Sequence, residues 1–416
     1  MKETSAASEG HLPTLIASFL HFDLSFMLWV LLGALGVYIA RDLGLSPAQK
    51  GLMVALPILS GSLMRVPLGL LSDRLGAKRV GVVMLAFLFL PLAIGWRASD
   101  GLSAVLATGL MLGVAGASFS VALPLASRWY PAHRQGLVMG IAAAGNSGTV
   151  IANLFAPRLA RVIGWHDVLG VAMLPLAVVI VAFALMAKDN ESGLVGAPVR
   201  YYAAVLRRND IWWFCFFYCV TFGGYVGLSG FLPIFFRDQY GVRPETAGYL
   251  TALAALVGSC VRPLGGYLAD RIGGARLLSI LLVGIAAAYA LASQMPPVAI
   301  MTGVIVIGMA NLGMGNGAVF QMVPMKFPRE IGVATGVVGA VGGLGGFLLP
   351  NLLGTIKQAT GAFGLAFGVL AATATGAFLL LKFVTARDRS LAVASARLSP
   401  MPTTASGISE IASASD

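Results

Sequence analysis

The chain has 416 residues, of which 58% are hydrophobic and only 11% are charged, and its formal net charge is +11. Soluble domains carry a charge on about a quarter of their residues, so this composition excludes a water-soluble fold and requires lipid around most of the surface. The basic residues lie in short segments between apolar runs, which indicates membrane topology rather than nucleic-acid binding.

Apolar runs long enough to span a bilayer follow one another along most of the chain. The first, from about Leu12 to Ala40, is too long for a cleavable signal peptide, so it predicts a spanning helix. Charged or turn-rich breaks then predict twelve spans in all, at 14–40, 48–71, 80–97, 102–126, 136–160, 167–187, 210–236, 245–269, 277–293, 298–325, 332–356 and 363–384. We therefore expect an all-α membrane protein with both termini on one side.

Lysine and arginine predominate in the loops on the side that holds the termini, which predicts that both termini are cytoplasmic. The longest internal polar stretch, 188–209, divides the predicted helices into six and six. We expect an N-terminal half at 1–187, a cytoplasmic linker at 188–209, a C-terminal half at 210–384, and a disordered cytoplasmic tail, rich in Ala and Ser, at 385–416.

The two halves share a repeated segment. Residues 61–79 and 258–276 align without a gap, as GSLMRVPLGLLSDRLGAKR and GSCVRPLGGYLADRIGGAR. An even number of helices separates the two copies, so the halves have the same orientation. Parallel halves with a binding site between them are a transporter architecture.

Each copy of the repeat contains one arginine inside a predicted span. Arg65 precedes the cytoplasmic Asp73 by eight residues, which places it roughly 12 Å into the membrane, and Arg262 is equally far from Asp270. An arginine side chain is too short to reach the membrane surface from this depth by snorkelling. Two guanidiniums that face each other from the two halves can bind a flat oxyanion. We hypothesise that the anion relieves the repulsion between them and lets the halves close.

The loop after each arginine resembles the helix 2–3 motif of the major facilitator superfamily. It reads Gly69-x-x-x-Asp73-Arg74-x-Gly76-x-x-Arg79 and recurs as Gly266-x-x-x-Asp270-Arg271-x-Gly273-x-x-Arg276. Carboxylates and arginines at helix ends can pair with neighbouring helix termini. We expect Asp73, Arg74, Asp270 and Arg271 to act in gating; simple positive-inside anchoring is the alternative.

Two glycine-rich stretches resemble the signatures of the nitrate/nitrite porter family within that superfamily. They are GASFSVALPLASRWYPAHRQGLVMGIAAAGNSGT and GMGNGAVFQMVPMKFPREIGVATGVVGAVGGLGGFLLP. The resemblance implies a major facilitator fold and transport of nitrate and nitrite across the bacterial cytoplasmic membrane. It also implies anion-binding roles for Arg65, Arg262, Asn146, Tyr218, Phe222 and Phe119.

Asp23 is the only acidic residue that we place inside a predicted span and away from its ends, and an intramembrane carboxylate is a candidate functional group. Accumulating nitrate against an inside-negative potential requires an energy source. Proton symport through Asp23 is the expected mechanism, while nitrate/nitrite exchange, which the resemblance also allows, needs no carboxylate. Asp23 could instead pair with an arginine or cap a backbone group.

Other function classes fit less well. A channel would need a continuous polar pore, a sensor would carry longer cytoplasmic extensions, and a carrier of another small anion conflicts only with the signature stretches. The chain has no nucleophile–base pattern or phosphate loop, so we expect no enzyme activity and no cofactor. Its three cysteines lie in apolar runs without metal-ligand spacing. The expected partners are nitrate, nitrite, protons and membrane lipids, with no nucleic acid, and the expected state is a monomer.

Overall fold

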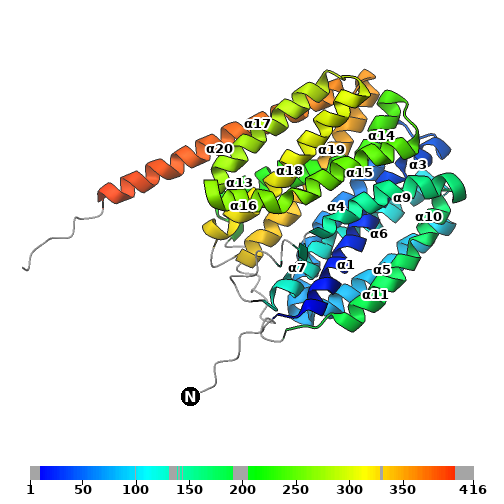
Figure 1. The fold of residues 1–416 in the computed structure, drawn as a ribbon, viewed down its shortest axis with the longest axis horizontal. Helices are drawn as coiled ribbons and strands as arrows, with labels where there is room; N and C mark the ends of the chain where they lie inside the picture. Colours follow the sequence, from blue (N-terminus) through cyan, green and yellow to red (C-terminus); the bar gives the residue numbers. More distant parts are fainter. Residues whose placement is uncertain are drawn as a thin grey trace, which may run out of the picture.

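The computed structural model describes residues 10–98, 100–130, 138, 141–142, 144–190, 205–327 and 331–398. These residues form helices joined by short loops, and no strand occurs among them (Figure 1). The helices of the N-terminal half are α1 (Leu12–Trp29), α2 (Leu31–Ala34), α3 (Gly36–Asp42), α4 (Pro47–Leu75), α5 (Ala77–Arg97), α6 (Leu102–Leu112), η1 (Gly113–Ser118), α7 (Phe119–Ser127), η2 (Ala144–Ser147), α9 (Gly148–Ile163), α10 (Trp165–Val171) and α11 (Met173–Met186). Those of the C-terminal half are α13 (Asn209–Tyr218), η4 (Cys219–Gly223), α14 (Gly224–Tyr240), α15 (Pro244–Cys260), α16 (Arg262–Ile272), α17 (Gly274–Ser293), α18 (Val298–Lys326), α19 (Ile331–Thr360) and α20 (Gly364–Leu398).

Among the described residues, eleven continuous helical stretches are long and apolar enough to cross a membrane. Each coincides with one of the predicted spans. The remaining predicted span, 136–160, corresponds to η2 and α9, and much of its beginning lies outside the described residues. The all-α membrane fold expected from the sequence is therefore confirmed.

The two halves lie side by side as separate helix groups (Figure 1). Their loops have the same backbone conformation at equivalent positions. Gly44 and Gly241 have φ values of 61° and 66°, and Gly76 and Gly273, in the repeated loop, have φ values of 93° and 88°. Glycine adopts such positive φ values without steric cost, so the two halves share turn geometry as well as sequence.

The halves meet where α2 packs against α14. A Cβ atom on Gly33 would lie far inside van der Waals contact with the carbonyl oxygen of Gly230, so only glycine allows this approach. The two glycines are 197 residues apart, the same separation as between Arg65 and Arg262. The contact therefore joins equivalent positions of the two halves.

The structure differs from the sequence-based expectation at the C-terminal end. We expected disorder from Thr385 onward, but α20 continues to Leu398. The added segment contains several alanines, leucines and arginines, which favour helix, and so it extends the preceding span. Residues 399–416 lie outside the described part of the chain, as does much of the expected linker, at 191–204.

Candidate functional site

Arg65 lies at the interface between the halves, on the long helix α4. Its side chain is only 2% exposed. Nε donates a hydrogen bond to the carbonyl oxygen of Gly116 in η1, at 3.1 Å, and Nη1 donates to the carbonyl oxygen of Gly339 in α19. The guanidinium thus touches both halves, as the sequence predicts for a residue between them.

Aromatic rings surround the Arg65 guanidinium. Its Cζ atom lies 5.3 Å from the ring centroid of Phe119, 4.8 Å from that of Phe222 and 5.6 Å from that of Trp29. Rings at these distances attract a cation and exclude water. The predicted pocket residues Phe119 and Phe222 therefore do lie at Arg65, from opposite halves.

Arg262 begins α16, directly after the break that ends α15 at Cys260. It is 9% exposed, and its Nη2 donates a hydrogen bond to the Tyr218 hydroxyl oxygen at 3.2 Å. The Tyr218 ring stacks on Phe222 with the centroids 4.9 Å apart and an interplanar angle of 1°. Since Phe222 also contacts Arg65, a continuous chain of side chains connects the two arginines.

The site contains hydrogen-bonding capacity that the described residues do not use. Nη2 of Arg65, Nη1 of Arg262 and Oδ1 of Asn146 are buried without a hydrogen-bond partner among them. No ion pair among the described residues involves either arginine. Buried polar atoms are normally satisfied, and a buried charge without a counter-charge is costly. An anion between the halves would supply both the acceptor and the charge.

Asn146 is 2% exposed and lies in the short 3₁₀ segment η2. The adjacent Ser147 hydroxyl donates a hydrogen bond to Oδ1 of Asp23, on α1, at 2.6 Å. A Cβ atom on Gly148 would overlap the carbonyl oxygen of Asp23, so α1 and α9 cross as closely as two helices can. The carboxylate of Asp23 is therefore tied to the backbone segment that carries Asn146. It forms no ion pair with either arginine.

Three of the helices at the site lose α-helical geometry where they reach it. The 3₁₀ segment η1 supplies the Gly116 carbonyl to Arg65, and η2 carries Asn146. The π-helical turn η4 contains Phe222 and directly follows Tyr218. Such irregular turns change the direction of side chains and are common at functional sites.

The repeated loops contain the residues for which we predict a gating role. Asp73 pairs with Arg128, at the end of α7 in the same half, while Arg74 is exposed. In the second copy Asp270 and Arg271 are exposed, and the guanidinium of Arg271 lies 4.6 Å from the ring centroid of Tyr267 on its own helix. The contacts that these residues make are thus within one half, and their gating role stays a prediction.

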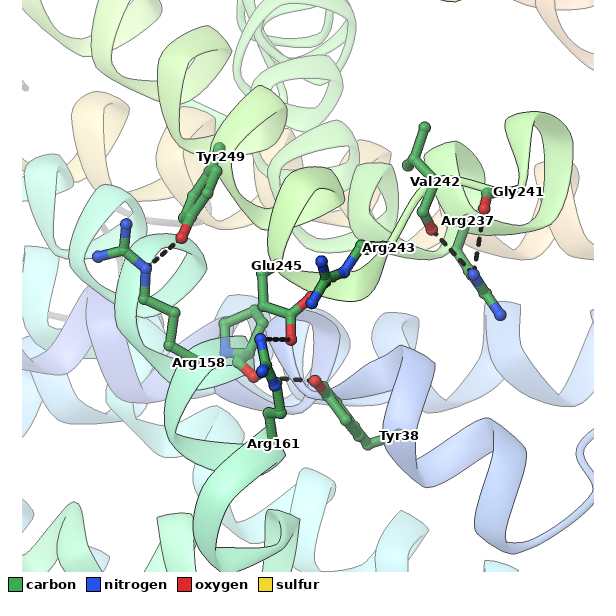
Figure 2. Close-up of polar contacts among 10 residues, drawn as sticks. Tyr38, Arg158, Arg161, Arg237, Gly241, Val242, Arg243, Glu245 and Tyr249 are labelled. Carbon is green, nitrogen blue, oxygen red and sulfur yellow. Dashed lines mark hydrogen bonds and ion pairs between the residues drawn. The ribbon is translucent and has the colours of Figure 1, made fainter.

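Polar contacts join the two halves at the end of the bundle away from the termini (Figure 2). Arg161 reaches from the end of α9 to Glu245 at the start of α15, with 3.5 Å between Nη1 and Oε1. Figure 2 shows the same carboxylate flanked by Arg243 of its own half, and Arg158 donating to the Tyr249 hydroxyl.

A second ion pair joins the halves at this end. Nζ of Lys50, on α4, lies 2.6 Å from Oδ2 of Asp238, on α14. With the Arg161–Glu245 pair it forms a set of contacts that we call the distal contacts.

Several residues of the site were not predicted from the sequence. Trp29 and Phe320 complete its aromatic wall, and the Phe320 ring lies 4.7 Å from that of Tyr218 and 5.8 Å from that of Phe119. Phe320 lies in one of the signature stretches, four residues after Asn316. An aromatic residue within that stretch could have been predicted to belong to the site. No sequence signal identifies the two backbone carbonyls that accept hydrogen bonds from Arg65.

Comparison with known proteins identifies the family. The model for the Major Facilitator Superfamily matches residues 17–350. The chain is 34% identical to the "Nitrite extrusion protein" of Bacillus subtilis, over 88% of this chain and 92% of that protein. It is 33% identical to the "Probable nitrate/nitrite antiporter NarK1" of Thermus thermophilus, over 87% and 89%. It is 36% identical to the "Probable nitrate/nitrite transporter NarK2" of Mycobacterium tuberculosis, over 79% and 85%.

The fold agrees with a solved structure. A bacterial homologue of the human lysosomal transporter Spinster, in an inward-facing and occupied conformation, superimposes with a TM-score of 0.64 over 89% of this chain and 94% of that one, at 19% identity. The chain belongs to the major facilitator superfamily and, within it, to the nitrate/nitrite porter family.

Proposed function

We propose that this protein transports nitrate and nitrite across the bacterial cytoplasmic membrane by alternating access, as a monomer with both termini in the cytoplasm. One observation carries the proposal: two buried guanidiniums, one from each half, each keep an unpaired nitrogen inside an aromatic-walled site. The names of relatives, among them a probable nitrate/nitrite antiporter and a nitrite extrusion protein, support the same anions.

The proposed anion site uses planarity and charge together. Each guanidinium offers a planar fork of donors, which matches the flat arrangement of oxygens in nitrate or nitrite. The Asn146 amide and the Tyr218 hydroxyl add neutral donors, and the stacked rings of Tyr218 and Phe222 add an apolar surface beside them.

Charge repulsion supplies the coupling between binding and movement. The stacked rings of Tyr218 and Phe222 connect the two guanidiniums, and burial strengthens the repulsion between the like charges. An anion between them turns that repulsion into attraction from both sides, so the loaded carrier closes around it. The distal contacts would then break and re-form in each cycle, and Asp73, Arg74, Asp270 and Arg271 would act at the opposite end.

Proton symport is the coupling that we propose first. Asp23 is half-buried inside a spanning helix, and its bond to Ser147 connects it to the segment that carries Asn146. Taking up a proton would weaken that charge-assisted bond and so change the position of an anion ligand. Nitrate/nitrite exchange is the second candidate, favoured by the relative from Thermus thermophilus that is named an antiporter.

Uptake into proteoliposomes that contain the purified protein tests the function. We expect labelled nitrate and nitrite to enter, with accumulation when a pH gradient is imposed. Exchange predicts instead that uptake needs internal nitrite and ignores the gradient. Failure to move either anion under both conditions, by protein that reconstitutes in folded form, would refute the proposed function.

A further inference from the structure

Asn316 lies near the middle of α18 and is 1% exposed. Its Oδ1 atom is buried and has no hydrogen-bond partner in the described part of the chain. Buried side-chain amides almost always have partners, so an amide without one requires an explanation. The same lack of a partner among the described residues is true of Oδ1 of Asn146 and of one guanidinium nitrogen each of Arg65 and Arg262, which belong to the anion site.

The register of α18 places Asn316 beside that site. Phe320 is one helical turn further on, and its ring forms part of the aromatic wall with Tyr218 and Phe119. Gly317, the next residue, packs against α16, because a Cβ atom there would lie 2.5 Å from the carbonyl oxygen of Arg262. Asn316 therefore lies between the aromatic wall and the helix that begins with Arg262.

The repeat gives Asn316 a counterpart in the N-terminal half. Gly69 packs against Ser120, and Gly266 packs against Gly317. The members of each equivalent pair, Gly69 with Gly266 and Ser120 with Gly317, are 197 residues apart. The residue before each contact position is thus Phe119 in one half and Asn316 in the other.

The equivalence of Phe119 and Asn316 indicates where Asn316 lies relative to Arg262. Phe119 lies against the Arg65 guanidinium, with 5.3 Å between Cζ and the ring centroid. In the repeat, Asn316 has the same position relative to Arg262 as Phe119 has relative to Arg65, and Nη1 of Arg262 is buried without a hydrogen-bond partner among the described residues. We therefore expect an apolar ring beside one arginine and an amide beside the other.

We propose that Asn316 is an anion ligand on the Arg262 side and that it favours nitrate over nitrite. Its amide nitrogen donates to an oxygen of the anion, and its Oδ1 accepts from Arg262 and holds the guanidinium in place. Nitrate has one oxygen more than nitrite, so it can use one donor more than nitrite in addition to the guanidiniums, Asn146 and Tyr218. This inference rests on the proposed transport of these anions.

Binding measurements on the purified full chain test the inference. Nitrate and nitrite would be titrated separately by calorimetry into wild type, Asn316→Ala and Asn316→Asp. We expect Asn316→Ala to raise the Kd for nitrate about tenfold or more, since it removes a hydrogen bond to a charged group, and to raise the Kd for nitrite less. Asn316→Asp keeps the size of the side chain but adds a negative charge beside Arg262, so it should abolish binding of both anions.

The matched control is Asn311→Ala on the same helix. The Asn311 amide donates to the Ile307 carbonyl oxygen at 2.8 Å and lies away from the site, so both Kd values should equal those of wild type. Melting temperatures without anion show whether each variant is folded, and Asn316→Ser replaces Asn316→Ala if the latter is not. Folded Asn316 variants that bind nitrate as tightly as Asn311→Ala overturn this inference and leave the proposed function intact. A wild type that binds neither anion overturns both.

Discussion

Replacing Arg65 with lysine keeps the positive charge but removes the planar fork of donors. In the structure the Arg65 guanidinium donates hydrogen bonds to the carbonyl oxygens of Gly116 and Gly339, which lie in different halves. Its Nη2 has no partner among the described residues, and the guanidinium lies close to the rings of Phe119 and Phe222. A lysine ammonium has neither the second nitrogen nor the flat face. It can hold the charge near the anion, but it cannot bridge the halves and bind the anion at the same time.

The magnitude follows from the bonds lost. A hydrogen bond to a charged group contributes about 1.5–3 kcal/mol, and Arg65→Lys removes at least one to the anion. A loss of about 3 kcal/mol, at the upper end of this range, corresponds to an approximately hundredfold weaker affinity, since each 1.4 kcal/mol is tenfold. We therefore expect the KM for nitrate uptake to rise by about two orders of magnitude, or uptake to fall below detection.

The assay compares nitrate uptake into proteoliposomes with nitrate-dependent thermal stability of the same preparation. At nitrate a hundredfold above its Kd, binding should stabilise wild type by about 2.7 kcal/mol, and Arg65→Lys should show almost none of this gain. The matched control is Arg97→Lys, because Arg97 is exposed at a helix end with its guanidinium 4.0 Å from the ring centroid of Trp96. A folded Arg65→Lys protein whose KM lies within threefold of that control would show that the fork of Arg65 does not bind the anion.

Three other changes test the coupling, the distal contacts and the packing. Asp23→Asn should abolish accumulation driven by a pH gradient but preserve exchange of nitrate for nitrite; uptake that stays fully proton-dependent would remove Asp23 from the mechanism. Glu245→Gln should weaken the contact with Arg161 and so raise the reactivity of cysteines engineered at the distal end toward an impermeant thiol reagent. Unchanged labelling would mean that the Arg161–Glu245 pair does not hold that end closed. Gly148→Ala should destabilise the protein by about 1–3 kcal/mol because the added Cβ overlaps α1, while Gly303→Ala, which meets nothing within 4 Å, should not; equal melting temperatures would contradict the packing argument.

Much of the fold could be predicted from the sequence because lipid imposes simple rules. A spanning helix must be long and apolar, so hydropathy alone located the helices. The repeat around Arg65 and Arg262 then paired two costly charges and predicted one site between two halves. Tyr218, Phe222 and Phe119 came from family resemblance, and the structure brings all three to the arginines.

Other parts of the site depend on backbone geometry that leaves no pattern in the amino-acid sequence. The 3₁₀ segments η1 and η2 and the π-helical turn η4 interrupt stretches whose hydropathy is uniform, so the sequence predicted continuous helices there. The carbonyl oxygens of Gly116 and Gly339 are acceptors that every residue possesses, and only the fold selects these two. The extension of α20 was missed because a segment rich in Ala and Ser was taken as disorder, although its alanines favour helix.

The contact between Gly33 and Gly230 has the form of an interface in a two-fold symmetric homodimer. Such an interface is isologous: the same patch on each partner meets its own copy across the axis. A six-helix ancestor that dimerised in parallel and then fused would leave this arrangement within one chain. Both copies are small here: a Cβ atom on Gly33 would overlap the Gly230 carbonyl oxygen, and one on Gly230 would press on the side chain of Val54. Away from the axis the copies face different neighbours, and there Phe119 and Asn316 have become different residues. Fusion therefore gave one carrier two independently variable halves of a binding site, which no homodimer can have.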